Sequence, residues 1–182
     1  MTLGIDIDDT LVQTNKKALE IIKAEKIAGD ITYYEQLDNL SDFISKYFVQ
    51  IVCTAELFEG AKEVLEWLHS EGNRIIFVTS RAYQRGADTE EDTINYLKEK
   101  NIEYDNIYLR TPDKLGVCLS ENIDVFIDDK EKILKPLSEA GIRCIKMLSH
   151  EAGPSQFETV NCWDEIKELL SKKSNGETNI MI

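Results

Sequence analysis

Residues 2–10 of the chain read TLGIDIDDT, a short β-rich run that ends in carboxylates. The apolar and β-branched residues of this run predict a strand over residues 2–7. Successive side chains of a strand point to opposite faces, so a spacing of two puts Asp6 and Asp8 on the same side. Two carboxylates held that close repel each other, and one protonates unless a cation lies between them. The run therefore predicts a strand that leads into an acidic site.

Four further apolar runs follow the pattern of buried parallel strands. They are residues 74–78 (RIIFV), 106–109 (NIYL), 123–127 (IDVFI) and 143–147 (RCIKM). Helical periodicity occupies residues 13–27, 59–70, 89–100, 114–121, 131–140 and 163–173. Alternating strands and helices indicate parallel strands joined by right-handed crossovers. We therefore expect an α/β fold: a Rossmann-like three-layer core whose parallel sheet has about five strands.

Residues 14–58 break this alternation. We expect them to form a small helical cap inserted after the first strand, with residues 1–13 and 59–173 as the core domain and 174–182 as a polar C-terminal tail. Thr14 is a candidate N-cap for the first cap helix. Aromatic residues are frequent in the insert, and their helical spacing favours a small apolar core of the cap over stacking on a base. They are Tyr33, Tyr34, Phe43, Tyr47 and Phe48.

The composition is that of an acidic globular domain. The 182 residues include 21 Lys and Arg against 34 Asp and Glu, which gives a net charge of −13 and a pI near 4.6. Nucleic-acid polymers and anionic membranes are bound through broad basic surfaces, so we expect neither as a partner. An anionic small ligand would need a local cation. No apolar run approaches the roughly 18 residues that span a bilayer, and we expect a cytoplasmic protein.

Cysteine and histidine form no recognisable metal or redox motif. The four cysteines are far apart and lack a Cys-x-x-Cys pair, so we expect buried free thiols in a reducing compartment. They are Cys53, Cys118, Cys144 and Cys162. His69 and His150 fall away from the predicted strand ends, and we expect them to be solvated or structural.

Polar side chains stand where three predicted strands end. The first strand ends in Asp6-Ile7-Asp8-Asp9-Thr10, the second in Thr79-Ser80-Arg81 and the fourth in Asp128-Asp129, with Lys114 in the preceding segment. Open α/β sheets bind ligands outside the carboxyl ends of their strands. Any one of these features is more often a solvated turn or a helix cap, but three at strand ends indicate a common site. Its carboxylates supply the hard oxygen ligands that Mg²⁺ prefers.

These motifs closely resemble those of the haloacid dehalogenase superfamily of phosphohydrolases, over residues 2–147. The run from Asp6 to Thr10 matches the first family motif, Thr79 the second, Lys114 the third and Asp128-Asp129 the fourth. Within the superfamily the layout resembles the cytosolic 5′(3′)-deoxyribonucleotidase-like branch. The shared features are the insert, the Gly60-Ala61-Lys62-Glu63 opening of the next helix, and the Thr-Ser-Arg after the second strand. Asp9 stands where such enzymes often have glycine.

The resemblance implies roles for these residues. Asp6 would attack phosphorus, and Asp8 would act first as general acid and then as general base. Thr79 would donate to a phosphoryl oxygen, while Lys114 would neutralise developing charge. Mg²⁺ would be held by the Asp6 carboxylate, the Asp8 backbone carbonyl and Asp128, with Asp129 acting through water.

Three further residues are candidates for substrate binding: Thr10, Ser80 and Arg81. Arg81 would contact the substrate phosphate or a cap carboxylate, or else lie on the surface as an ordinary arginine.

We therefore expect a Mg²⁺-dependent phosphomonoester hydrolase that works through an aspartyl-phosphate, and more narrowly a 5′-nucleotidase for deoxyribonucleoside monophosphates. One alternative is a phosphatase of the same superfamily for another small ester, such as a sugar phosphate or phosphoglycolate. Another is a non-hydrolytic phosphoacceptor or binding protein. A receiver module accepts phosphate at the end of its third strand, whereas here the acids follow the first and fourth strands. The expected partner is a small-molecule phosphate ester, and the oligomeric state stays open.

Overall fold

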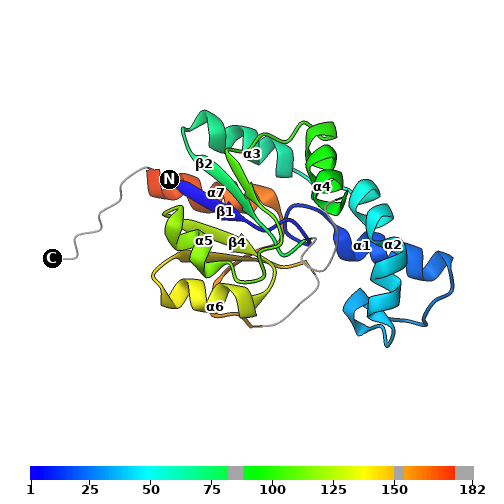
Figure 1. Cartoon of the computed structure of the whole chain (residues 1–182). Coiled ribbons are helices and arrows are strands. Elements are labelled where there is room, and N and C mark those ends of the chain that lie inside the picture. Colours follow the sequence, from blue (N-terminus) through cyan, green and yellow to red (C-terminus); the bar gives the residue numbers. More distant parts are fainter. Residues whose placement is uncertain (82–87, 150–153, 175–182) are drawn as a thin grey trace.

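One parallel sheet organises the computed structural model, which describes residues 1–81, 88–149 and 154–174. The strand order is β3-β2-β1-β4-β5-β6. The strands are β1 (Thr2–Ile5), β2 (Arg74–Val78), β3 (Asn106–Tyr108), β4 (Val125–Asp128), β5 (Arg143–Met147) and β6 (Glu158–Val160). The chain begins in the middle of the sheet and later strands are added on both sides of β1 (Figure 1). The carboxyl ends of β1, β2 and β4 therefore lie side by side at the switch point of the sheet.

The sixth strand was not predicted. β6 spans three residues, of which Glu158 and Thr159 are exposed and only Val160 is buried. So short an edge strand contains no apolar run that would reveal it. The expected sheet of about five strands is thus corrected to six, while the α/β class is confirmed.

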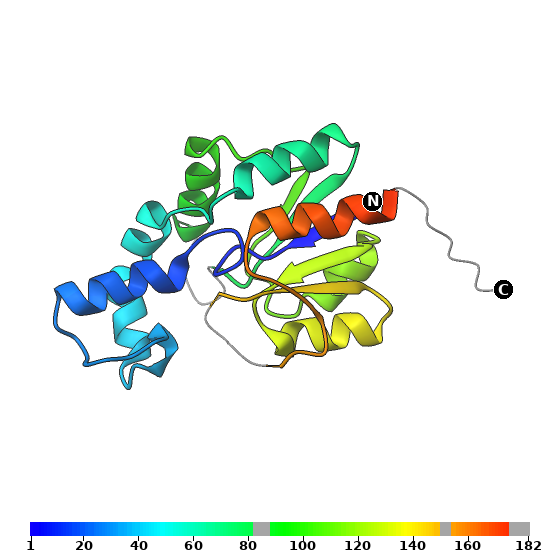
Figure 2. The same ribbon diagram turned by 180° about the vertical axis from the view of Figure 1, so that it is seen from behind.

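Helices cover both faces of the sheet, which gives the three predicted layers (Figure 1 and Figure 2). Ile75 and Phe77 of β2 face the cluster under α3, α4 and α7, whereas Ile76 and Val78 face the cluster under α5 and α6. Burial on both faces is why β2 reads as a continuous apolar run. The helices are α1 (Thr14–Ala24), the 3₁₀ helix η1 (Tyr34–Gln36), α2 (Leu40–Thr54), α3 (Ala61–Ser70), α4 (Asp88–Glu99), α5 (Leu115–Ser120), α6 (Glu131–Glu139) and α7 (Trp163–Ser174).

The helices α1, η1 and α2 stand apart from the three layers, beyond the carboxyl ends of the strands (Figure 1). They have an apolar cluster of their own, in which Phe43 and Tyr47 are buried. Tyr33, Tyr34 and Phe48 are only partly buried. The cluster accounts for three of the five aromatic residues as packing residues of this unit, because Tyr34 also packs against it.

This unit is tied to the core at its connections and along α4. The chain enters and leaves it side by side, because the Gln13 amide donates to the Glu56 carbonyl at 2.8 Å. Helix α2 packs against α4, and the Tyr96 hydroxyl of α4 donates to the Ala55 carbonyl at 2.7 Å. The unit is therefore anchored along α4 as well as at its two connections.

The first of these helices begins differently from the prediction. Thr14 is the first residue of α1 rather than its N-cap, so that prediction is wrong. Gln13 occupies the N-cap position but makes no side-chain cap. The Asp9 carboxylate accepts the Asn15 amide instead, at 2.7 Å, from the loop before the helix. The helix ends at Ala24, earlier than predicted.

The cysteine prediction is corrected in part. All four thiols are free, but Cys53 is exposed and Cys162 is half-buried, while the other two are buried as expected. None of the helices within 1–81, 88–149 and 154–174 is long and apolar enough to cross a membrane. Of the predicted tail, Ser174 ends α7. Residues 175–182 and His150 lie outside the described residues.

Candidate active site

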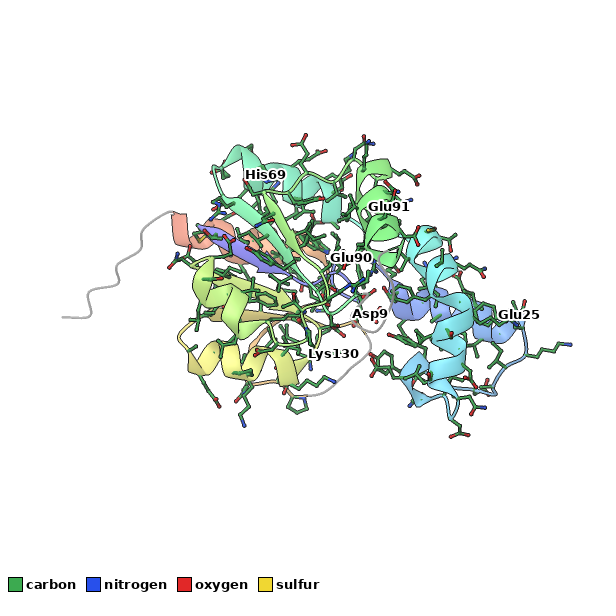
Figure 3. All side chains as sticks on the ribbon, in the orientation of Figure 1. Asp9, Glu25, His69, Glu90, Glu91 and Lys130 are labelled. Carbon is green, nitrogen blue, oxygen red and sulfur yellow. The ribbon has the colours of Figure 1, made fainter. Side chains whose placement is uncertain are left out.

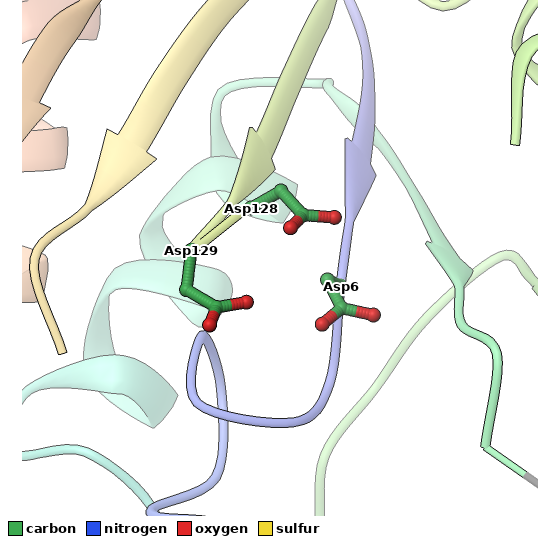
Figure 4. A group of neighbouring side chains, drawn as sticks. All are labelled: Asp6, Asp128 and Asp129. Atoms are coloured by element: carbon green, nitrogen blue, oxygen red, sulfur yellow. The ribbon is translucent and has the colours of Figure 1, made fainter. Parts of the chain in front are cut away.

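Three carboxylates meet at the ends of the two central strands. Asp6 follows β1, and its amide donates to the Ile127 carbonyl of β4 at 3.0 Å, which keeps the two strand ends in register. Asp128 ends β4 and Asp129 follows it. Figure 4 shows the three side chains pointing toward one another. Each is buried and offers a carboxylate oxygen, and these oxygens lie within 4.8 Å of one another. Such a set suits a hard divalent cation.

Lys114 lies between two of these carboxylates. Its Nζ is 2.7 Å from Asp6 Oδ1 and 2.7 Å from Asp128 Oδ2, and its side chain is 4% exposed. Burial opposes a charge on Lys114, but the two carboxylates outweigh burial and raise its pKa above the ordinary value. The buried lysine therefore stays cationic and offsets the repulsion between the acids. It occupies the N-cap position of α5, so the backbone fixes where its side chain begins.

Burial and mutual repulsion raise the pKa values of Asp6 and Asp129. Burial raises the pKa of Asp6 to about 6, with Lys114 opposing and Asp128 adding to the rise. Burial and then the charges of Asp128 and Asp6 raise the pKa of Asp129 to about 9. A divalent cation would lower the pKa values of Asp6 and Asp129, because a nearby positive charge stabilises the ionised carboxylates that burial destabilises.

Asp8 is not one of the three clustered carboxylates and has partners of its own, although its charge adds to the rise in the pKa of Asp6. β1 ends at Ile5, and the chain turns at Asp9, whose φ is +57°. The Asp8 carboxylate meets Arg81 Nε at 3.2 Å through Oδ2, meets Arg81 Nη2 through Oδ1, and accepts the Thr14 hydroxyl at 2.6 Å. Burial favours a higher pKa for Asp8, but Arg81 and Thr14 outweigh burial and lower it. Asp6 and Asp8 thus have one cation each instead of a shared one.

The remaining predicted residues lie around this pair of sites. Thr79 is buried at the end of β2, and its hydroxyl accepts the Arg81 amide at 3.1 Å. Ser80 is exposed. Thr10 is buried, and its carbonyl accepts Trp163 Nε1 at 3.0 Å, which ties the loop to α7. Substrate contacts of these residues stay predictions.

Lys130 was missed by the sequence reasoning. Its amide donates to Asp128 Oδ1 at 2.8 Å, and its Nζ lies 2.8 Å from Glu35 Oε1 of η1. The same ammonium group lies over the Tyr33 ring, 5.7 Å from its centroid. Lys130 therefore connects the acidic strand end to the helices beyond it. Its place directly after Asp129 was the only signal in the sequence, because Glu35 is 95 residues away.

His69 lies away from the site, as expected. Figure 3 shows it on the far side of the core from Asp9 and Lys130, which face α1 and α2. Its Nε2 is 3.2 Å from Asp105 Oδ2, and the same carboxylate accepts the Ile75 amide. The pair is structural.

The chain is similar to known proteins in sequence and in fold. Residues 1–174 match the family described as 5′ nucleotidase, deoxy (pyrimidine), cytosolic type C protein. The chain belongs to this family. A "Putative nucleotidase" of Bacillus cereus is 21% identical over 192 residues, which cover 95% of this chain and 100% of the relative. The predicted deoxyribonucleotidase-like branch is thereby confirmed at the level of the family.

Solved structures share the fold of this nucleotidase-family chain. A "predicted phosphoglycolate phosphatase" of Haemophilus somnus superposes with a TM-score of 0.66 at 15% identity, over 93% of this chain and 97% of its own. A HAD family hydrolase of Deinococcus radiodurans with bound phosphate and sodium has a TM-score of 0.64 at 14% identity, over 95% and 96%. The fold is that of the haloacid dehalogenase superfamily. Family and fold together identify a phosphatase of that superfamily.

Proposed function

We propose that this nucleotidase-family phosphatase hydrolyses a phosphomonoester in two steps through an aspartyl-phosphate on Asp6, with Mg²⁺ as cofactor. One observation carries the proposal: the buried carboxylates of Asp6 and Asp128 meet at the strand ends, with Lys114 Nζ 2.7 Å from each. An acidic nucleophile repels an anionic phosphate, and a fixed buried cation beside it offsets that repulsion. The same lysine supplies the local cation that a chain of net charge −13 needs.

The reaction divides one displacement into two. In the first step an Asp6 oxygen attacks phosphorus, so that a new O–P bond forms and the ester O–P bond breaks. Asp8, which has to enter this step in its protonated form, gives its proton to the leaving alkoxide, which departs as the alcohol. In the second step water attacks the same phosphorus, Asp8 takes the proton of that water, and the Asp6 O–P bond breaks. Inorganic phosphate leaves, and both carboxyl groups regain their starting forms.

The carboxylate cluster fits a magnesium ion. Asp6 and Asp128 would hold it with their carboxylates and Asp8 with its backbone carbonyl. Asp129, whose carboxylate oxygen lies within 4.8 Å of those of Asp6 and Asp128, would act through water. When bound, the ion neutralises charge on the phosphoryl oxygens. Thr79 and Ser80, at the end of β2, would donate to those oxygens, and Thr10 is the third candidate from the loop after β1.

The substrate that we propose is a deoxyribonucleoside 5′-monophosphate, and the compartment is the cytoplasm. Membership of the deoxynucleotidase family, described as cytosolic, supports both. Residues 14–58 would act as a cap that selects the leaving group, which their position beyond the strand ends supports (Figure 2).

Replacing the nucleophile tests the proposal. Asp6→Asn keeps the shape of the side chain but removes the attacking oxygen, so phosphate release from deoxynucleoside monophosphates should fall below about 1% of wild type. The wild-type protein should lose activity in excess chelator and regain it with Mg²⁺, which should also raise Tm. Glu71→Gln, an exposed acid at the turn between α3 and β2, at the opposite end of β2 from Thr79, is the matched control and should behave as wild type.

Circular dichroism and Tm show whether the Asp6→Asn protein is folded. Phosphate release by a folded Asp6→Asn protein at wild-type rates would reject Asp6 as nucleophile. Full activity in chelator would reject the metal.

A further inference from the structure

Arg81 is a buried charge whose side chain is 0% exposed. Its backbone is fixed on both sides, since its amide donates to Thr79 Oγ1 at 3.1 Å and its carbonyl accepts the Arg110 amide at 3.0 Å. A buried guanidinium is tolerated only where it is paired and hydrogen-bonded. Its partner here is Asp8, across the gap between the end of β2 and the loop after β1.

Arg81 and Asp8 form a bidentate ion pair. Arg81 Nε donates to Asp8 Oδ2 at 3.2 Å and Nη2 donates to Oδ1, which also accepts the Thr14 hydroxyl. Both oxygens of the carboxylate are therefore engaged by donors. The proposed reaction places a proton on one of these oxygens, and a protonated oxygen accepts the guanidinium N–H less strongly than an ionised one, so the contact weakens as the proton is carried.

One nitrogen of the guanidinium is unused. Arg81 Nη1 is buried and has no hydrogen-bond partner among the described residues. A buried donor without an acceptor is unfavourable, and an oxygen of a bound phosphate ester would satisfy it. The donors of a guanidinium lie in one plane. If the Arg81 guanidinium turns toward a phosphate oxygen, its hydrogen bond to one oxygen of Asp8 therefore weakens.

We propose that Arg81 is a positioning residue for Asp8: it holds the carboxylate in the resting enzyme and releases one oxygen when the phosphate ester offers an acceptor to the guanidinium. The inference rests on the proposed function, because it assigns Arg81 to the leaving-group proton of that reaction. Arg81 acts on the reaction through Asp8. This role differs from that of a residue that only binds the substrate phosphate.

A series of aryl phosphates with leaving groups from nitrophenol to phenol separates these roles. A nitrophenolate leaves without a proton, whereas a poorer leaving group depends on the general acid. The quantity kcat/KM includes only steps up to formation of the aspartyl-phosphate, so it reports protonation of the leaving group without the second step. Loss of positioning should make kcat/KM fall more steeply as the leaving group becomes more basic.

Arg81→Lys keeps the charge but lacks the fork. We expect it to lower kcat/KM for phenyl phosphate at least about tenfold more than for p-nitrophenyl phosphate. Asp8→Asn should steepen the dependence in the same way, and Arg81→Lys added to Asp8→Asn should steepen it no further, because coupled residues are not additive.

Equal losses across the series would overturn the inference and leave Arg81 as a phosphate contact. A further steepening in the double variant would overturn it too. Arg81→Gln is the second variant, and circular dichroism is the folding control; failure of both Arg81 variants to fold would show a structural role and reject the inference. A wild-type protein that hydrolyses none of the esters would instead refute the proposed function, and this inference with it.

Discussion

At the scale of single residues, the run from Asp6 to Asp9 gives three acids three different surroundings. Asp6 faces Lys114, and Asp8 faces Arg81. The Asp9 carboxylate accepts the Asn15 amide at the start of α1. Neighbouring carboxyl groups of one loop are thereby pushed to different pKa values, which is how one site obtains groups with different roles.

Asp9→Asn should stabilise the metal-free protein, and more at pH 8 than at pH 5. Burial raises the pKa of Asp9 from 3.8 to about 7. The folded protein therefore binds this proton more tightly than the unfolded chain does, and its contribution to stability is lost as pH rises through about 7. Asparagine keeps the acceptor and tolerates the positive φ. We expect a gain on the order of 1–2 kcal/mol at pH 8, measured by Tm in chelator.

Asp9→Ala is the matched control. It removes the acceptor of the Asn15 amide and disfavours the φ of +57°, so it should lower Tm at both pH values. A Tm gain for Asp9→Asn that is larger at pH 5 than at pH 8 would contradict the burial argument.

At the scale of elements, the approach of β1 to the Phe126 ring depends on one glycine. A Cβ at Gly4 would lie 2.4 Å from Phe126 Cδ2 and 2.7 Å from Ile123 Cδ1. Phe126 belongs to the cluster under α5 and α6, and Lys114 Nζ lies 5.4 Å from the centroid of its ring. Packing under β1 and placement of the lysine are therefore linked through one ring.

Gly4→Ala should destabilise the fold by about 1–3 kcal/mol, because the buried ring has to move into a filled cluster. Gly116→Ala is the control: its added Cβ meets nothing within 4 Å, in an exposed turn of α5, and alanine favours the helix. Urea unfolding of the two variants measures the difference. A Gly4→Ala protein as stable as Gly116→Ala would show that the ring yields freely.

The sequence predicts an element well when the pattern that specifies it lies within one short stretch of the chain. The apolar run of β2 reveals the strand because Ile75 to Val78 are all buried, whereas β6, with only Val160 buried, has no such run. The strand-end acids are also visible in the sequence, because they directly follow runs that are recognisable as strands. The pairing of Asp8 with Arg81 joins residues 73 positions apart. It depends on the turn at Asp9, which no periodicity encodes.

At the scale of the whole molecule, the insert lies apart from the residues of the proposed chemistry. Every proposed catalytic and metal-binding residue belongs to the core, while α1, η1 and α2 lie beyond the strand ends (Figure 1). The two connections meet as a hairpin, with an antiparallel bridge from Val12 to Leu57 and the Gln13 amide donating to Glu56. A short linker between Gln13 and Glu56 would therefore close the core without spanning a gap.

Replacing residues 14–55 by a short Gly/Ser linker should preserve phosphate-ester hydrolysis but impair the choice of leaving group. We expect Mg²⁺-dependent hydrolysis of p-nitrophenyl phosphate to persist, because Asp6, Lys114 and Asp128 stay in place. For a deoxynucleoside monophosphate, kcat/KM should fall at least about tenfold further, since remote binding energy that orients the large leaving group is lost. Tm should also fall, because α2 no longer covers α4. Circular dichroism checks the fold, and equal losses on the two substrates would show that the insert does not select the leaving group.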